Sequence, residues 1–166
     1  MPDMSKPHAV VVLENIRSAH NVGAIFRTAE SIGVSKIYLV GYTPAPIDRF
    51  GRAQPDIVKT ALGADTMVEW EHALSSRAVL EKLKHDGVHI VAVERDTEAI
   101  DYKSCNVQNK IAFIFGNEID GVSKEACTMA DEIISLPMNG RKESLNVSVA
   151  AGIVLYRLLD RNAQST

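Results

Sequence analysis

Cysteine and long apolar runs are scarce in this sequence, and each scarcity excludes a class of protein. The 166 residues include only two cysteines, Cys105 and Cys127, which lie far apart and outside any Cys-x-x-Cys spacing. They offer neither a disulfide framework nor a metal-binding pair, and the five histidines are equally scattered. We therefore expect no metal and a reducing cytoplasm. No apolar run is long enough to cross a membrane and no secretory signal segment is present, so we expect no membrane partner.

An excess of basic residues is also lacking. The net charge of −3 argues against a strongly basic protein that coats nucleic acid. Basic residues nevertheless gather in or near predicted loops: Arg17, Arg27, Arg49, Arg52, Lys59, Arg141 and Lys142. Composition alone leaves two interpretations open, solvated surface charges or a local patch for a polyanion.

Apolar runs and helical periodicities alternate along the chain, without repeats or linkers. Short β-branched runs predict strands, and apolar residues at helical spacing predict helices. The expected strands are residues 10–13, 36–40, 89–93, 111–115 and 133–136; the expected helices are residues 21–31, 57–62, 73–84, 124–129 and 144–161. This alternation predicts one α/β domain over residues 1–166, with a mainly parallel sheet flanked by helices and joined by right-handed crossovers. Ligands of such domains bind at the carboxyl ends of the strands.

Two polar segments follow predicted strands directly. In residues 14–21, Asn21 is a candidate helix N-cap, and Arg27 lies on the flank of the following helix, where it can be a surface charge or face a phosphate. In residues 116–121, the two flanking glycines allow the backbone to approach a ligand closely. Val122 stands where a phosphate-binding loop requires lysine, and no Gly-x-Gly-x-x-Gly pattern occurs. The second segment therefore predicts a turn, or a ligand loop of another kind.

The third polar segment leads into the last helix. We expect Ser144 to cap this helix and Asn146 to lie in its first turn. Residues 147–159 are apolar or aromatic at almost every position. A helix of this kind is buried on nearly every face, which in a small domain predicts a subunit interface as well as a core.

Taken together, the three segments resemble the SpoU/TrmH branch of the SPOUT RNA methyltransferases. The resemblance covers most of the chain, from Val10 to the end of the last helix. It is carried by Glu14, Asn15 and residues 20–29 in the first motif, by residues 115–118 with Gly121 in the second, and by residues 136–138 and 144–148 in the third.

The resemblance implies a parallel α/β sheet with a C-terminal trefoil knot and a homodimer assembled through the C-terminal helix. It implies S-adenosylmethionine as methyl donor, held largely by main-chain groups of Gly116, Leu136, Met138 and Leu145. The implied reaction transfers a methyl group to a ribose 2′-hydroxyl of RNA and needs no metal.

The catalytic set that the resemblance implies is Arg27, Asn21, Glu118, Ser144 and Asn146. Because a guanidinium stays protonated in proteins, we expect Arg27 to hold a phosphate and position the hydroxyl. Relatives often carry an additional RNA-binding domain, and we expect none here, so the catalytic domain itself must bind RNA. The candidate RNA-binding residues are Arg17, Arg49, Arg52, Lys59, Arg141 and Lys142. Minimal members of this branch often modify tRNA, whereas members with extensions often modify rRNA, so the resemblance favours tRNA over rRNA as the substrate here.

Two other functions remain open at this stage. One is a catalytically inactive RNA-binding or assembly protein that keeps the S-adenosylmethionine pocket. The other is an unrelated α/β nucleotide-binding enzyme, which the missing phosphate-loop lysine and dinucleotide pattern disfavour.

Overall fold

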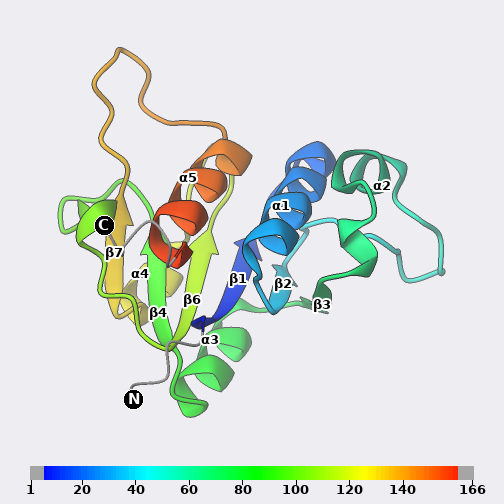
Figure 1. Cartoon of the computed structure of the whole chain (residues 1–166), viewed down its shortest axis with the longest axis horizontal. Helices are drawn as coiled ribbons and strands as arrows, with labels where there is room; N and C mark the ends of the chain where they lie inside the picture. Colours follow the sequence, from blue (N-terminus) through cyan, green and yellow to red (C-terminus); the bar gives the residue numbers. More distant parts are fainter. Residues whose placement is uncertain (1–5, 161–166) are drawn as a thin grey trace.

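The computed structural model describes residues 6–160 and consists of a seven-stranded sheet with helices on both faces (Figure 1). The strands are β1 (His8–Glu14), β2 (Lys36–Val40), β3 (Glu69–Ala73), β4 (His89–Val93), β5 (Ile100–Asp101), β6 (Lys110–Phe115) and β7 (Glu132–Ser135). Their spatial order is β3-β2-β1-β6-β4-β7-β5, and every pairing is parallel. The expected α/β class with a parallel sheet is confirmed.

The α-helices are α1 (Ala19–Ile32), α2 (Pro55–Ala61), α3 (Ser76–His85), α4 (Lys124–Met129) and α5 (Val147–Leu159). Two short 3₁₀ turns, η1 (Ala64–Thr66) and η2 (Tyr102–Ser104), complete the elements. None of the helices between residues 6 and 160 is long and apolar enough to span a bilayer.

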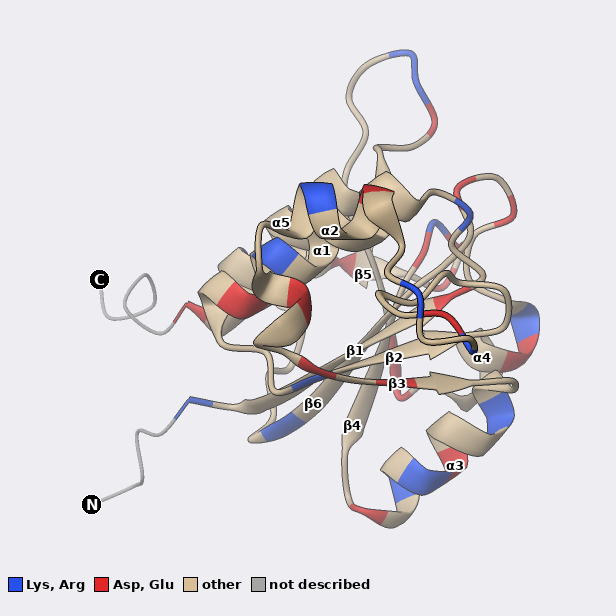
Figure 2. Ribbon diagram, turned by 90° about the vertical axis from the view of Figure 1, so that its right-hand side faces the viewer, with Lys and Arg blue, Asp and Glu red and all other residues tan. Residues whose placement is uncertain are grey.

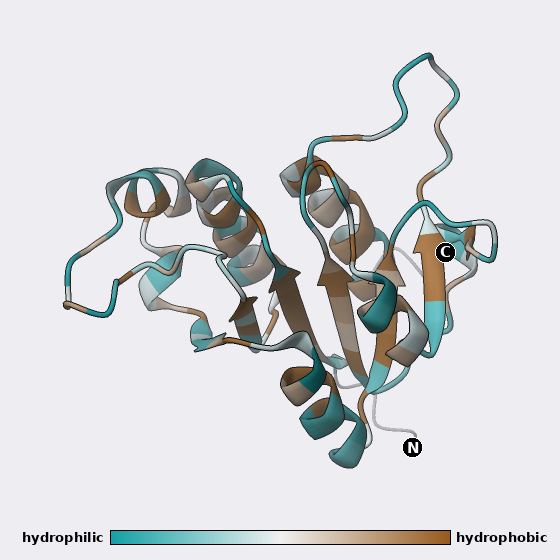
Figure 3. Cartoon of the chain, turned by 180° about the vertical axis from the view of Figure 1, so that it is seen from behind, coloured by the Kyte–Doolittle hydropathy of each residue, from teal (hydrophilic) through white to brown (hydrophobic). Residues whose placement is uncertain are grey.

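Alternating side chains of the strands build two cores, one on each face of the sheet. In β1, Val11 and Leu13 pack with α1, α2 and α5, whereas Val10 and Val12 pack with α3 and α4. Figure 3 shows the resulting layers, with apolar strands enclosed between helices whose outer sides are polar. Because the central strands are buried on both faces, they read in the sequence as continuous apolar runs.

Two predicted helices begin three residues too early. The helix expected over residues 73–84 begins at Ser76, capped by Ser75, because residues 69–73 form strand β3. This edge strand is largely exposed and carries polar residues, so it lacks the apolar run that identifies a buried strand. The last helix, expected over residues 144–161, is Val147–Leu159, and Arg161 lies outside the described residues.

Helix α5 is not buried on every face. One side packs into the core through residues such as Val154 and Leu158, while Val149, Ile153 and Tyr156 are exposed. The Tyr156 hydroxyl contacts the Ser31 hydroxyl of α1 at 2.8 Å. The molecule therefore presents an apolar stripe along α5, beside α1.

Candidate ligand site at the carboxyl ends of the strands

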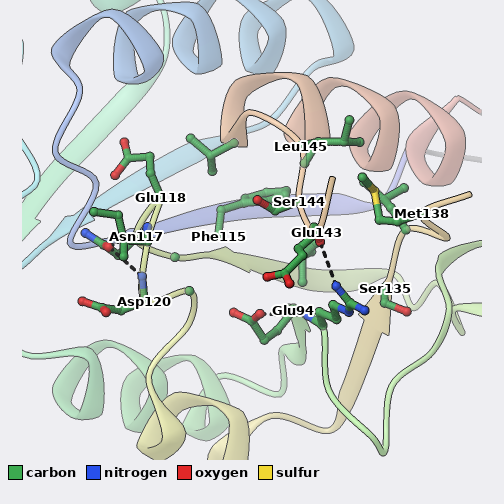
Figure 4. A pocket seen from close by; sticks show the side chains of 18 residues that line it. Glu94, Phe115, Asn117, Glu118, Asp120, Ser135, Met138, Glu143, Ser144 and Leu145 are labelled. Carbon is green, nitrogen blue, oxygen red and sulfur yellow. Dashed lines mark hydrogen bonds between the residues drawn. The ribbon is translucent and has the colours of Figure 1, made fainter. Parts of the chain in front are cut away.

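A cavity of about 200 Å³ lies where β4, β6 and β7 end and α5 begins (Figure 4). The three segments that follow these strands line the cavity, and residues from 143 to 150 line it on the side of α5. Parallel strands place their carboxyl ends on one edge of the sheet, which is why segments distant in sequence meet here.

The loop after β6 is folded tightly against itself. A Cβ atom on Gly116 would lie 2.3 Å from the carbonyl carbon of Gly121 and from the backbone nitrogen of Val122. Gly121 has a φ of +71°, and its amide donates to the carbonyl oxygen of Asn117 at 2.8 Å. Only glycine fits at Gly116, because the approaching atoms belong to the backbone.

Asn117 connects this loop to two others. Its side-chain oxygen accepts hydrogen bonds from the amides of Ile119 and Asp120, both at 2.9 Å. Its side-chain nitrogen donates to the carbonyl oxygen of Asn15 at 2.8 Å and to the Tyr42 hydroxyl at 2.7 Å. This buried amide therefore joins the ends of β1, β2 and β6. It was not among the candidate site residues, although its position directly after an apolar strand was a signal.

Glu118 contacts the beginning of α1. Its carboxylate accepts hydrogen bonds from the backbone amides of Arg17 at 3.1 Å and Ser18 at 3.2 Å, and from the Asn21 side chain at 3.4 Å. Burial opposes ionisation of the Glu118 carboxyl, but these donors outweigh it and lower its pKa. The carboxylate occupies the positive end of the helix, where an anion is favoured.

The prediction that Asn21 caps α1 is wrong. Ser18 is the N-cap, and its hydroxyl accepts from the Asn21 amide at 3.2 Å. Asn21 consequently lies in the first turn, and this position directs its side chain to Glu118. The structure thus brings two of the five predicted catalytic residues into contact.

Arg27 stands apart from the cavity within a single chain. It is exposed on α1 and is not one of the lining residues. Its side chain makes no hydrogen bond or ion pair within residues 6–160. Ser31, one turn further along α1, contacts Tyr156 in the exposed apolar stripe of α5, so helix geometry places Arg27 on the side of α1 that faces this stripe.

The loop between β7 and α5 supplies the third wall. Leu136, Met138 and Leu145 line the cavity together with Gly116, so the four residues that were predicted to hold a cofactor lie together. Ser144, a predicted catalytic residue, also lines it. The loop itself rises away from the body of the molecule (Figure 1).

The predicted cap of the last helix is also wrong. Asn146, not Ser144, is the N-cap of α5, and its side-chain oxygen accepts from the Ser148 amide at 2.8 Å and the Ser148 hydroxyl at 2.6 Å. An asparagine that is poor inside a helix is well suited to this position, because its side chain replaces a missing backbone acceptor. Asn146 does not line the cavity.

Two charged residues after β4 line the cavity and were not predicted. Glu94 accepts from the Val122 amide at 2.6 Å and the Arg95 amide at 2.8 Å, and Arg95 donates to the Glu143 carbonyl oxygen at 3.3 Å. Glu94 therefore fastens the loop after β6 and Arg95 the segment before α5. Both residues directly follow a predicted apolar strand, which is the feature by which the other polar segments were selected.

The lining combines apolar side chains with an excess of negative charge. Four acidic residues and one basic residue line the cavity: Glu94, Glu118, Asp120, Glu143 and Arg95. Phe115, Leu136, Met138 and Leu145 contribute apolar surface. Such a cavity suits a ligand that carries an apolar ring and a positive charge. Across the described chain, no three His, Cys, Asp or Glu side chains gather closely enough to hold a metal ion.

The predicted RNA-binding residues are spread over the surface. Arg17 precedes α1, Arg49 and Arg52 lie in the loop before α2, Lys59 lies in the last turn of α2, and Arg141 and Lys142 lie in the loop before α5. All six are exposed. Figure 2 shows basic segments interspersed with acidic ones on helices and loops.

The fold is an α/β domain with a cavity at the carboxyl ends of its parallel strands, the position where domains of this class bind small ligands. Comparison with known proteins specifies the family: the family model described as SpoU rRNA Methylase matches residues 8–156, and the chain belongs to this family. It is 33% identical to the 23S rRNA (guanosine-2′-O-)-methyltransferase RlmB of Neisseria meningitidis, over 93% of this chain and 59% of that protein. It is 32% identical to the tRNA (guanosine(18)-2′-O)-methyltransferase of Thermus thermophilus, over 91% of this chain and 74% of that protein.

Solved structures of RNA methyltransferases superpose closely on this chain. The AdoMet-bound rRNA methyltransferase from Sinorhizobium meliloti superposes with a TM-score of 0.84 at 27% identity, covering 93% of this chain and 56% of that one. The TrmH/SpoU tRNA modifying enzyme of A. aeolicus superposes with a TM-score of 0.83 at 28% identity, covering 96% of this chain and 78% of that one. The chain spans 59% to 62% of the length of several curated relatives that it matches.

Proposed function

We propose that this protein transfers a methyl group from S-adenosylmethionine to a ribose 2′-hydroxyl of RNA. The observation that carries this proposal is the cavity, in which Gly116, Leu136, Met138 and Leu145 meet at the carboxyl edge of the sheet. The relatives named as guanosine-2′-O-methyltransferases of tRNA and rRNA support the reaction and the substrate class.

The cavity fits the methyl donor chemically. Apolar side chains and main-chain groups of the three loops suit the adenine ring, and the acidic lining suits a sulfonium cation. When bound, S-adenosylmethionine supplies an electrophilic methyl group. The chain must then hold the ribose hydroxyl in line with it and help remove the hydroxyl proton.

The proposed roles of the polar residues follow from their contacts. Glu118 anchors the start of α1 and, through Asn21, keeps the segment after β1 beside the cavity. Asn146 begins α5, which positions Ser144 and Leu145 at the cavity wall. Arg27 binds a phosphate of the RNA and orients the hydroxyl. Because the guanidinium remains charged, a phosphate oxygen relays the hydroxyl proton to solvent.

Two copies of the chain form the working unit in this proposal. The exposed apolar stripe of Val149, Ile153 and Tyr156 supports an interface through α5. Arg27 borders that stripe, so a second copy packed there lies beside Arg27. A dimer therefore explains how a residue outside the cavity of its own chain takes part in the reaction. The trefoil knot remains a prediction from the family resemblance.

The exposed basic residues are the proposed RNA surface: Arg17, Arg49, Arg52, Lys59, Arg141 and Lys142. Because the chain carries a net negative charge, we expect modest, salt-sensitive RNA affinity. We expect tRNA as the preferred substrate and the cytoplasm as the location.

A second candidate function is an RNA-binding or assembly protein that binds S-adenosylmethionine without turnover. The position of Arg27 outside the cavity favours this alternative. Binding of the donor is expected from both functions, and methyl transfer from the first only.

The decisive experiment measures transfer of labelled methyl from S-adenosylmethionine to unmodified tRNA and rRNA pools, followed by nucleoside analysis. We expect a 2′-O-methylnucleoside in the tRNA pool, and its loss in Arg27→Ala with donor affinity retained. Arg77→Ala is the matched control, because Arg77 is an exposed arginine of α3 on the opposite face. Donor binding without transfer to either pool would support the second candidate, and absence of donor binding would refute both.

A further inference from the structure

The loop between β2 and α2 presents an aromatic side chain to solvent. Phe50 is 67% exposed, and the loop projects from the sheet on the side of α2 (Figure 1). It follows the carboxyl end of β2 and therefore leaves the same edge of the sheet as the loops that line the cavity. Single exposed apolar residues are common on protein surfaces and alone indicate nothing. The surroundings of Phe50 distinguish it.

The backbone of this loop is held in one conformation. Ile47 and Ala53 form an antiparallel bridge, and the Asp48 amide donates to the Arg52 carbonyl oxygen at 2.9 Å. The Asp48 carboxylate accepts from the amides of Phe50 at 2.8 Å and Arg52 at 3.0 Å. These bonds leave the Phe50 ring at the tip without a core to pack against. The ring is exposed because of the loop geometry, not because the loop lacks structure.

Two guanidinium groups lie over the ring. Those of Arg49 and Arg52 are 4.8 Å and 5.1 Å from its centroid. Arg52 is fixed, since its Nε donates to Asp48 Oδ2 at 2.9 Å. Arg49 makes no hydrogen bond or ion pair with any residue between 6 and 160. One arginine is therefore part of the loop, and the other is able to move away from the ring.

An aromatic ring with adjacent guanidinium groups matches the chemistry of an unpaired nucleotide. A base stacks on the ring, and a guanidinium binds the neighbouring phosphate. A protein partner would require a larger apolar surface, and both groups that lie over the ring are charged guanidinium groups. A paired base cannot stack on the ring in this way, because both of its faces already stack on neighbouring bases inside the RNA double helix.

We propose that Phe50 is a stacking platform for an unpaired base of the substrate RNA. Arg49 leaves the ring and binds the flanking phosphate, while Arg52 stays on the ring, held by Asp48. This inference rests on the proposed function and restricts its substrate class: the methylated RNA carries an unpaired nucleotide, in a loop or a bulge, near the target ribose.

The test measures RNA binding without the methyl donor. The probes are a short oligoadenylate and an abasic ribose-phosphate oligomer of the same length and charge. We expect Phe50→Ala to weaken oligoadenylate binding about five- to a hundredfold and to leave binding of the abasic oligomer unchanged. Met67→Ala is the matched control, because Met67 is 71% exposed and precedes β3 at the opposite edge of the sheet. It should bind both oligomers like the unaltered protein.

A fluorescent variant reports stacking directly. Trp70 is the only tryptophan, so a Phe50→Trp, Trp70→Phe protein carries its single indole at the loop tip. Oligoadenylate should quench this indole, whereas an indole introduced by Met67→Trp in the same background should not respond. Oligoadenylate binding that is equal in Phe50→Ala and the unaltered protein would overturn the inference and leave the proposed function intact. A protein that binds donor but neither oligomer nor tRNA would overturn both.

Discussion

The side-chain amide of Asn117 donates to the backbone carbonyl of Asn15 at 2.8 Å, across 102 positions of sequence. The same nitrogen donates to the Tyr42 hydroxyl, so one buried group joins the segments that follow three neighbouring strands. Buried amides of this kind are costly unless every bond is made. The candidate site is therefore assembled as a unit, and its loops should respond together to changes at one position.

Substitution of Asn117 by aspartate should uncouple these loops. Asn117→Asp keeps the acceptor for Ile119 and Asp120 but removes both donated bonds, which should lower the free energy of unfolding by about 1–3 kcal/mol. Urea titration and calorimetric titration with S-adenosylmethionine measure stability and donor affinity. Tyr42→Phe is the control, since it removes one partner and leaves the bond to Asn15. An Asn117→Asp protein as stable as the Tyr42→Phe protein would contradict this view of the loop.

Gly116→Ala should weaken donor binding about five- to 150-fold. The added Cβ lies 2.3 Å from backbone atoms of residues 121 and 122, so the loop must move, at a cost of about 1–3 kcal/mol. Calorimetric titration with S-adenosylmethionine measures the effect. Gly140→Ala tests the general effect of adding a methyl group to a glycine, because a Cβ there meets nothing within 4 Å. Normal donor affinity in Gly116→Ala would show that the close approach is unnecessary.

Acidification should weaken the contact of Glu118 with α1. The pKa of Glu118 is lowered in the folded protein, so the carboxylate stabilises the fold above its unfolded pKa of about 4.3. This contribution is lost as the pH falls through the lower, folded pKa. We expect Glu118→Gln to lower the melting temperature at neutral pH and to reduce the further loss below pH of about 4. Melting curves across this range provide the measurement, and parallel pH profiles of the two proteins would argue against the role.

Removal of the helix cap should affect stability, and removal of Ser144 should not. Asn146→Ala deletes the acceptor for the Ser148 amide and should cost about 1 kcal/mol of unfolding free energy. Ser144→Ala changes an exposed side chain and should stay within about 0.5 kcal/mol, while it reduces methyl transfer. Denaturant titration and the transfer assay separate the two effects. Equal destabilisation by both variants would mean that the cap is not confined to Asn146.

A charge on the exposed face of α5 should separate the subunits. Ile153→Lys places a cation in the middle of the apolar stripe, and the protein should sediment as a monomer at micromolar concentration. Methyl transfer should fall with dimerisation, while donor binding is retained. Leu74→Lys serves as the comparison, because Leu74 is an exposed apolar residue that follows β3. Dimers of Ile153→Lys in analytical ultracentrifugation would exclude this face as the interface.

Local sequence patterns determined most of the elements. The bounds of β2, β4 and α4 match the predictions, because β-branched runs and a helical stripe report burial within a few residues. Strand β3 was missed since its polar residues lie at an edge, and β5 has only two residues. Such strands form because they pair with a neighbouring strand. Because the pairing partner is distant in sequence, a local pattern does not reveal them.

The features of the candidate site also separate into those that the sequence determined and those that only the tertiary structure decided. The sequence by itself determined which segments follow strands, and with the family resemblance it named Gly116, Leu136, Met138 and Leu145, which meet in the cavity. Only the tertiary structure decided that Asn146 caps α5, that Glu94 and Asn117 fasten the loops, and that Arg27 lies outside the cavity of its own chain. Segment positions follow from local backbone preferences, whereas hydrogen-bond partners depend on the packing of the whole sheet.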